Sequence, residues 1–481
     1  MSSFFIDEIL GLPEGKTLEF KRDLSSPKPL LKTLVAFANT AGGRLIVGVG
    51  DDKTVIGVGD PLDEEEKLSN LIADSIAPRL VPNIELTTVD GKTLLLVEVF
   101  LSSSRPHFLK VEGPEAGVYV RLGSSNRQAD RELVGELRRS VEGPSFDEMP
   151  MPELSVDDLD LAAASQLFGK NRPLDEAKLI TLRLLCRHQG RLVPTKGAVL
   201  LFGKERLMHF PDAWVQCGRF HGTEKINIFD HIEIDQPLPK ALDDIMLFLK
   251  KHAYRGADLS EIRRKDVWSI PLSILREVVI NALVHTDYSQ RGAPIRVVFL
   301  DDRIEVENPG ILLPGLTVED VKQGTSKIRN NVIARVFREL NLIEQWGTGV
   351  QRIFAEAVEL GLPEPTITEI GMRVRFSVPL LESITVGIVK RSTEQVSEQV
   401  GAPVSEQVWS LLQACSGPSK SRQALLSSVG LSNAYLNYKR HIAPLLEQGL
   451  LEMTVPDKPN SRLQNYRLTE QGRQALARHR P

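Results

Sequence analysis

The chain has 481 residues, enough for two to four domains at the usual size of about 100–200 residues each. Hydrophobic residues make up 42% and charged residues 25%, and no apolar run reaches the ~18–20 residues of a membrane span. The net charge of −4 excludes binding to nucleic acid through overall positive charge. The N-terminus lacks the basic and apolar regions of a signal peptide, so we expect a cytoplasmic protein without a membrane partner.

Composition along the chain predicts a multidomain protein of mixed α/β and α+β class. Residues 143–156 are rich in proline and acidic side chains, and residues 386–408 repeat the tripeptide Glu-Gln-Val, so both segments favour linkers. We therefore expect an α/β domain, a linker, a second α/β domain with a helical start, a second linker and a small C-terminal domain, at 1–140, 141–156, 157–382, 383–404 and 405–481.

The first domain shows helix and strand patterns in turn. Apolar spacing predicts a helix over 30–40, which Gly42 and Gly43 end, and a buried strand over 44–49 follows it. A helix C-cap and a tight turn into the strand would also explain Asn39 and the two glycines. Further strands are expected at 54–58, 93–100 and 117–121.

Acidic side chains stand at three places in this domain. Glu14 and Glu19 lie five residues apart, and Asp51 follows the buried strand. Carboxylates from separate elements can hold Mg²⁺ or Mn²⁺ and position water for phosphodiester hydrolysis, and Lys21 can add a charge near the scissile phosphate. The alternative is that the three acids lie apart on the surface, because spacing in the sequence does not show that they converge.

Several separated motifs in residues 8–135 resemble the Schlafen AlbA-like (AlbA_2) domain. These motifs are Glu19-Phe20-Lys21, the run from Ala36 to Gly43, Ile46–Val49 with Asp51-Asp52, Arg105–Phe108, and Gly117–Ser124. Vertebrate relatives include nucleases that act on RNA, and their three catalytic acids match Glu14, Glu19 and Asp51. Many bacterial relatives are classed as transcriptional regulators, and this resemblance implies the alternative that the acids are retained for the fold or for ligand binding.

The second α/β domain is expected to contain a strand at 198–202, helices at 238–252 and 271–285, and a strand pair at 295–300 and 303–307. A helix at about 331–340 and a closing strand at 373–379 follow.

Three polar residues share one face of the predicted helix 271–285. Glu277, Asn281 and His285 recur every four residues, which places them in a row along the helix. The oxygen of Asn281 can ligate Mg²⁺, and Glu277 can activate a water molecule. The alternative is a hydrogen-bonded polar seam inside the domain.

Glycine-rich turns follow this helix, at Gly310 and at Gly347-Thr348-Gly349. Backbone N–H groups in such turns can hold phosphate. The order of helix, strand pair and two glycine sites resembles the GHKL (Bergerat-type) ATP-binding fold, an α/β sandwich, in the variety found at the C-terminus of RecG-type proteins. The resemblance implies that Glu277 and Asn281 form a Mg²⁺ box and that Gly347 and Gly349 form a phosphate loop, with His285, Gly310 and Thr348 beside the nucleotide.

Two features of the sequence differ from the motifs of ATP-driven motor proteins. Asn308-Pro309-Gly310 stands where the GHKL fold has its adenine-reading Asp-x-Gly, which counts against adenine recognition and, with it, against hydrolysis. The pattern G-x-x-x-x-G-K-[ST] does not occur, which excludes a P-loop helicase.

The C-terminal segment has the helix, helix, helix and hairpin order that resembles a winged helix-turn-helix. Its helices are expected at 408–414, 419–427 and 433–448, its hairpin from 449 to 468, and its last helix at 469–479. Lys and Arg exceed Asp and Glu by about five from Thr385 onward, which favours contact with phosphates.

Side chains of the third helix would face bases, and basic side chains of the helix and wing would contact phosphates. The base-facing candidates are Asn433, Tyr435, Asn437 and Tyr438. The phosphate-contacting candidates are Lys439, Arg440, Lys458 and Arg462. The alternative is a domain that mediates dimerisation or other protein contacts.

The leading hypothesis is a DNA-binding transcriptional regulator with a nucleotide-sensing middle domain. Winged-helix regulators bind paired half-sites, so we expect a homo-oligomer. One alternative is a nuclease that uses Mg²⁺ or Mn²⁺ held by Glu14, Glu19 and Asp51, acting on RNA or DNA. Another is a GHKL-type ATPase that uses Glu277 with the metal on Asn281.

Overall fold

The structure, a computed structural model, describes most of the chain. Its described residues are 3–169, 174–253, 255–258, 265–343, 348–380, 411–417, 419–429, 442, 445–446, 449–454 and 464–478. The chain forms two compact units, Met1–Gly387 and Ile388–Pro481. None of the described helices is long and apolar enough to cross a membrane.

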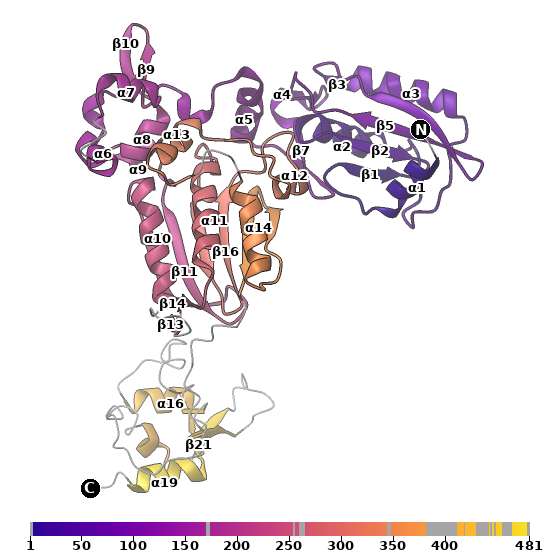
Figure 1. Ribbon diagram of the computed structural model, residues 1–481. Coiled ribbons are helices and arrows are strands. Elements are labelled where there is room, and N and C mark those ends of the chain that lie inside the picture. The colour runs from indigo at the N-terminus through magenta and orange to yellow at the C-terminus, as the bar shows by residue number, and fades with distance from the viewer. Residues whose placement is uncertain are drawn as a thin grey trace. The chain divides into compact units, whose positions relative to one another are not determined.

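The N-terminal domain is built on a four-stranded sheet in the order β1-β2-β5-β4, with β1 and β2 parallel and the other neighbours antiparallel (Figure 1). Its elements are α1 (Ser3–Gly11), β1 (Leu18–Lys21), α2 (Pro27–Asn39), β2 (Gly43–Val47), α3 (Pro61–Ser75), β3 (Ile76–Ala77), β4 (Asn83–Val89), β5 (Lys92–Val99), β6 (Phe108–Leu109), α4 (Gly113–Ala116), β7 (Tyr119–Leu122), β8 (Ser125–Gln128) and α5 (Arg131–Glu142).

Strand β2 is buried on both faces, which explains its continuous apolar run. Leu45 and Val47 belong to the core formed with α2 and α3, and Ile46 belongs to a second core with Ile6 and Ile9 of α1. The predicted helix and the strands at β2, β5 and β7 are confirmed, with shifts of one to three residues. The strand predicted at 54–58 is wrong, because only Val55 pairs there, in an isolated bridge.

The middle domain contains a six-stranded mixed sheet in the order β12-β11-β15-β16-β18-β17, in which only β11 and β15 run parallel. Its strands are β9 (Leu185–His188), β10 (Arg191–Pro194), β11 (Val215–His221), β12 (Asn227–Ile234), β13 (Arg255–Asp258), β14 (Lys265–Trp268), β15 (Ile295–Phe299), β16 (Arg303–Pro309), β17 (Thr366–Ile370) and β18 (Arg373–Pro379).

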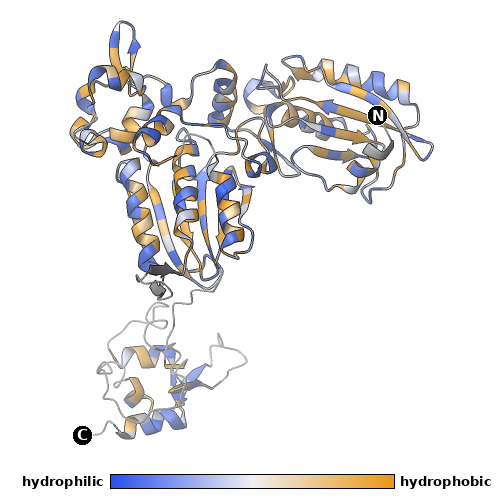
Figure 2. Cartoon of the chain, in the orientation of Figure 1, coloured by the Kyte–Doolittle hydropathy of each residue, from blue (hydrophilic) through white to orange (hydrophobic). Residues whose placement is uncertain are grey.

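Helices pack against this sheet, with α10, α11 and α14 side by side on one face (Figure 1). The α-helices are α6 (Leu161–Phe168), α7 (Glu176–Thr181), α8 (Lys196–Phe202), α9 (Arg206–His209), α10 (Leu238–His252), α11 (Leu272–His285), α12 (Val318–Lys322), α13 (Asn331–Glu339) and α14 (Gly349–Glu359). Helix α10 carries a hydrophobic stripe toward the core and a hydrophilic one away from it (Figure 2). The predicted helices at α10, α11 and α13 are confirmed.

The strand predicted at 198–202 is wrong, because this segment is part of helix α8. Thr195 caps the helix by accepting a hydrogen bond from the Ala198 N–H, and every residue from Gly197 to Phe202 is buried. A short apolar run without polar positions fits a buried helix as well as a buried strand, so periodicity could not separate the two.

The segment predicted as the first linker carries ordered structure, with the 3₁₀ turns η1 (Phe146–Glu148) and η2 (Val156–Asp158). The Asp147 side chain is buried and caps helix α13. Its Oδ2 accepts hydrogen bonds from the N–H groups of Val332 and Ile333, at 2.7 and 3.0 Å. The segment therefore anchors a helix of the middle domain.

The described residues of the C-terminal unit include a small sheet in the order β19-β21-β20 and helical segments. Its elements are β19 (Lys420–Ser421), α16 (Arg422–Ser427), β20 (Leu451–Met453), β21 (Asn465–Leu468) and α19 (Glu470–Arg478), and residues 411–414 are helical. The helix predicted from 419 begins only at Arg422, because residues 420–421 pair with β21. Most of the predicted third helix lies outside the described residues, so the winged helix stays a prediction.

Replacing Asp147 by Ala is expected to lower the free energy of unfolding by about 2 kcal/mol, since two buried N–H groups lose their acceptor. Urea unfolding followed by tryptophan fluorescence measures this change. The matched control is Asp160→Ala, which removes an exposed cap from α6 and should cost about 0.5–1 kcal/mol. Equal losses in the two variants would show that the Asp147 contact adds nothing beyond an ordinary cap.

Candidate functional site

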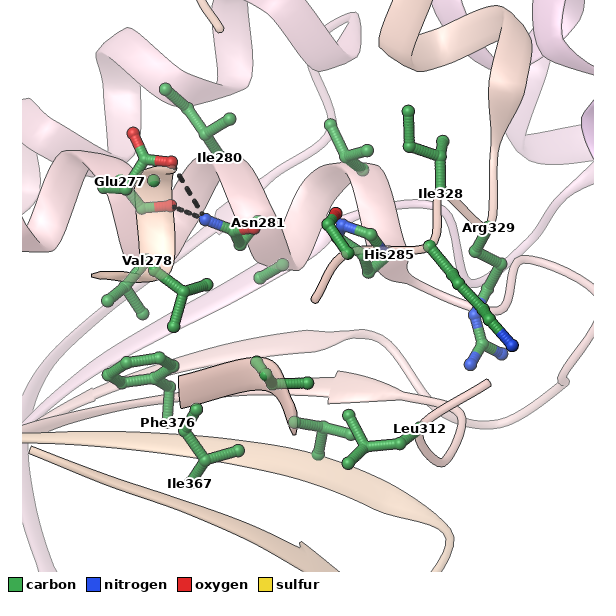
Figure 3. Close-up of a pocket in the computed structure, with 18 of the residues that line it drawn as sticks. Glu277, Val278, Ile280, Asn281, His285, Leu312, Ile328, Arg329, Ile367 and Phe376 are labelled. Carbon is green, nitrogen blue, oxygen red and sulfur yellow. Dashed lines mark hydrogen bonds between the residues drawn. The ribbon is translucent and has the colours of Figure 1, made fainter. Parts of the chain in front are cut away.

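A cavity of about 210 Å³ lies in the middle domain between helix α11, the sheet and the segment after β16. Figure 3 shows Glu277, Asn281 and His285 in a row along α11, with Ile367 and Phe376 facing them from the sheet. The predicted polar face therefore lines a cavity. Its apolar wall is formed by Leu312, Leu313, Leu316, Ile367, Val374 and Phe376.

Two hydrogen bonds fix the orientation of Asn281. Its Nδ2 donates to the backbone oxygen of Glu277 at 2.8 Å and to the Glu277 carboxylate at 3.1 Å (Figure 3). Both partners are acceptors, so the amide nitrogen must face them. The amide oxygen is thus the atom that Asn281 can offer to a cation or a water molecule.

The Glu277 carboxylate lies against the start of helix α14. A Cβ atom placed on Gly349 would lie 1.9 Å from Glu277 Oε1, so only glycine allows this approach. Thr348 and Gly349 both line the cavity, and the N–H groups of the first turn of α14 carry partial positive charge. Gly347 lies outside the described residues.

His285 lies at the end of the cavity where Arg329 enters it (Figure 3). Burial lowers the pKa of His285 to about 4, and the positive charge of Arg329 acts in the same direction. His285 is therefore neutral near pH 7 and can donate or accept a hydrogen bond.

Gly310 adopts a positive φ of +99° at the end of β16, and a Cβ atom there would collide with the Arg329 guanidinium. Gly310 thus leaves room for the Arg329 side chain. Arg329 and Asn308 both line the cavity, whereas Gly310 is not part of its lining. Sequence reasoning missed Arg329 and the lining residues Thr325, Ser326 and Lys327. The run Gly324-Thr325-Ser326-Lys327, small and polar and ending in a cation, was the signal that could have found them.

The N-terminal acids have separate environments. Glu19 is buried and forms ion pairs with the fully buried Arg121 and with Lys21. Glu14 is exposed and accepts a hydrogen bond from the Phe20 N–H at 2.9 Å, and Asp51 is exposed in the turn after β2. Within the described part of the chain, no group of three or more His, Cys, Asp or Glu residues is arranged to hold a metal ion. A Mg²⁺ or Mn²⁺ site at these acids stays a prediction.

Asn39 of the N-terminal motif is structural. Its side chain is fully buried, donates to the backbone oxygens of His107 and Tyr119, and accepts from the His107 N–H. The eight residues predicted to contact nucleic acid, from Asn433 to Arg462, all lie outside the described residues.

Comparison with domain families gives three matches. Residues 14–130 match the family "Schlafen, AlbA_2", and residues 292–378 match "Putative ATP-dependent DNA helicase recG C-terminal". Residues 406–469 match "Filamentation induced by cAMP protein Fic-like, C-terminal domain". The chain therefore carries a Schlafen AlbA_2 domain and a RecG C-terminal-type ATPase-like domain, as the sequence motifs predict. The second match begins after α11, so Glu277, Asn281 and His285 precede the matched residues.

Comparison with solved structures gives distant likenesses. The DIP2311 protein of Corynebacterium diphtheriae is 19% identical over 99% of this chain and 98% of its own, with a TM-score of 0.43. The N-terminal domain of a RecG-related protein from Nitrosomonas europaea is 30% identical over 27% of this chain and 94% of its own, with a TM-score of 0.22. Neither likeness defines the arrangement of the whole chain. A search of curated proteins returns no match.

The depressed pKa of His285 predicts a pH-dependent stability. Between about pH 6.5 and 4 the unfolded chain binds a proton at this position that the folded chain does not, so the stabilisation is present above pH 6.5 and is lost as the pH falls toward 4. Urea unfolding of the wild type should lose up to about 1.4 kcal/mol per pH unit relative to His285→Asn in this range. Parallel pH profiles of the two proteins would contradict the assignment.

Proposed function

We propose that this protein is a nucleic-acid-binding transcriptional regulator whose middle domain senses a nucleotide bound with Mg²⁺. The matched domain types associate the chain with nucleic-acid binding. The observation that carries the nucleotide-sensing part is the cavity under α11, where polar groups suited to a metal and phosphates adjoin an apolar wall.

The residues around the cavity fit the two ends of a nucleotide. Asn281 offers an amide oxygen to Mg²⁺. Glu277 lies close to Gly349, so the polar end of the cavity adjoins the N–H groups at the start of α14. The apolar wall, with Leu312 and Phe376, suits the flat face of a base. ATP bound there would supply a charged triphosphate and its metal.

Sensing is proposed ahead of turnover because the resemblance to the GHKL fold matches Asn308, and not an acid, to the adenine reader, and this departure counts against hydrolysis; Asn308 also lines the cavity. Its amide can both donate and accept a hydrogen bond, whereas a carboxylate only accepts. Hydrolysis with Glu277 as the base stays a prediction, and so does nuclease activity, since ion pairs with Arg121 and Lys21 already engage Glu19.

The nucleic-acid part of the proposal assigns DNA binding to the C-terminal unit. Its sequence carries the excess of basic residues, and its described residues include a small sheet and helices. Phosphate contacts by basic side chains would give affinity, and a homo-oligomer would engage paired half-sites. RNA in place of DNA is an outcome that the binding experiment distinguishes.

Titration calorimetry with ATP and Mg²⁺ tests the pocket. Wild type should release or absorb heat at one site per chain, and Asn281→Ala should weaken binding about tenfold, equal to about 1.4 kcal/mol, because a metal ligand is lost. Asn227→Ala, on the exposed face of β12 in the same domain, should bind as wild type does. A wild-type protein that gives no heat would rule out the nucleotide site.

The salt dependence of binding to a DNA duplex tests the C-terminal assignment. Replacing Lys439 and Arg440 together by Ala should weaken binding and reduce the slope of log K against log[salt] by about 2, since two phosphate contacts are lost. The control is the pair Lys240→Ala and Lys250→Ala, two exposed cations of α10. Fluorescence anisotropy with duplex DNA and with RNA of the same sequence measures the affinity and its salt slope for each variant. An unchanged slope would show that the predicted third helix of the C-terminal unit does not contact the DNA phosphates.

A further inference from the structure

Residues 310–329, called here the shared segment, form one wall of the cavity and also contact the N-terminal domain. Several of its residues line the cavity, among them Leu312, Leu313, Leu316, Thr325, Ser326 and Lys327. The segment includes helix α12, which Thr317 and Asp320 cap reciprocally, and it packs against α14. Its position therefore affects the shape of the cavity directly.

The first contact from the N-terminal domain is an ion pair that reaches the cavity wall. Lys16 Nζ lies 2.6 Å from Glu369 Oε2, and Glu369 Oε1 accepts a hydrogen bond from the Leu312 N–H at 2.8 Å. The Lys16 and Glu369 side chains are only 10% and 5% exposed. A carboxylate so buried needs its cation, because a buried charge without a partner is strongly disfavoured.

The second contact is a backbone hydrogen bond from Gly315 to Thr40. The Gly315 N–H donates to the backbone oxygen of Thr40, the residue that caps the C-terminus of α2, at 2.6 Å. Gly315 has a φ of +84°, and a Cβ atom there would lie 2.8 Å from Leu101 of the N-terminal domain and from Lys327. Only glycine allows both the backbone conformation and this close approach.

Two further contacts, one apolar and one ionic, lie at opposite ends of the segment. Ile311 is buried in a cluster whose other fully buried members all come from the N-terminal domain, among them Val118, Leu133 and Leu137. At the other end of the segment, Arg329 forms an ion pair with Glu136 of α5 at 2.6 Å, with both side chains buried. The shared segment is thus fixed to the N-terminal domain within its first six residues and again at its end.

We infer that the N-terminal domain completes the nucleotide pocket, with Lys16 and Glu369 as positioning residues that act through Leu312. The inference rests on the proposed function and adds to it the path by which the pocket and the N-terminal domain affect each other. Binding energies at two linked sites are reciprocal, so a nucleotide that orders the shared segment also stabilises the contacts at Lys16, Thr40 and Glu136.

The test uses the full chain with Lys16→Met, which keeps the length of the side chain and removes its charge. Hydrogen exchange of residues 310–329 without nucleotide should become about tenfold faster, and the Kd for ATP with Mg²⁺ should rise about tenfold. Lys28→Met is the matched control, because the Lys28 side chain is 66% exposed and pairs with Glu112 in the same domain. It should change neither quantity.

A double-mutant cycle separates positioning from general destabilisation. Glu369→Gln keeps an oxygen that can accept from the Leu312 N–H but loses the charge that needs Lys16. The double variant should therefore exchange more slowly at 310–329 than Lys16→Met alone. Additive effects, or exchange that Lys16→Met leaves unchanged, would overturn the inference. Should Lys16→Met fail to fold, Glu369→Gln alone decides, since it should still raise exchange at 310–329 above wild type.

The two measurements also separate this inference from the proposed function. Wild type that binds no ATP refutes the nucleotide pocket, while faster exchange of 310–329 in Lys16→Met still supports the positioning role. Wild type that binds ATP, with Lys16→Met binding equally well, refutes the positioning role alone. With ATP present, residues 38–43 of wild type should exchange more slowly, and unchanged exchange there would refute the reciprocal coupling.

Discussion

A charge that is removed from water needs a partner, and this constraint governs the interior of Met1–Gly387. In the N-terminal domain the fully buried Arg121 pairs with Glu19, and in the middle sheet Arg219 pairs with Asp301. Where the two domains meet, Lys16 pairs with Glu369 and Arg329 with Glu136. Replacing one member leaves the other charged and buried, so each pair fixes which segments must adjoin.

The cavity of the middle domain follows from the same arrangement. Helix α11 turns its apolar side to the core and its polar row to the cavity, because four-residue spacing keeps those side chains on one face. The far wall cannot be supplied by the sheet alone, and the shared segment closes it. That segment also packs on the N-terminal domain, so a wall of the cavity is in contact with both domains although every residue of its lining comes from the middle domain.

The sequence predicted what local patterns determine. Glu277, Asn281 and His285 were placed correctly on one face, because their relation depends only on helix geometry. Helix α8 was mistaken for a strand, since its buried residues carry no polar side to reveal the period. Arg329, Glu136 and Asp147 were missed because their partners are remote in the chain and no local pattern records such a contact. The residues of the predicted winged helix that would contact nucleic acid stay a prediction.

The Arg121–Glu19 pair affects how a loss-of-function experiment on the N-terminal domain must be read. The Arg121 side chain also donates to the backbone of Gly15 and Leu18, so it holds the strand on which Glu19 lies. An alanine at position 19 would leave the buried Arg121 guanidinium without its carboxylate partner and would disturb β1. Inactivity would then reflect misfolding as much as missing chemistry. Glutamine, which preserves an acceptor for Arg121, is the informative replacement for anyone asking whether this acid reacts.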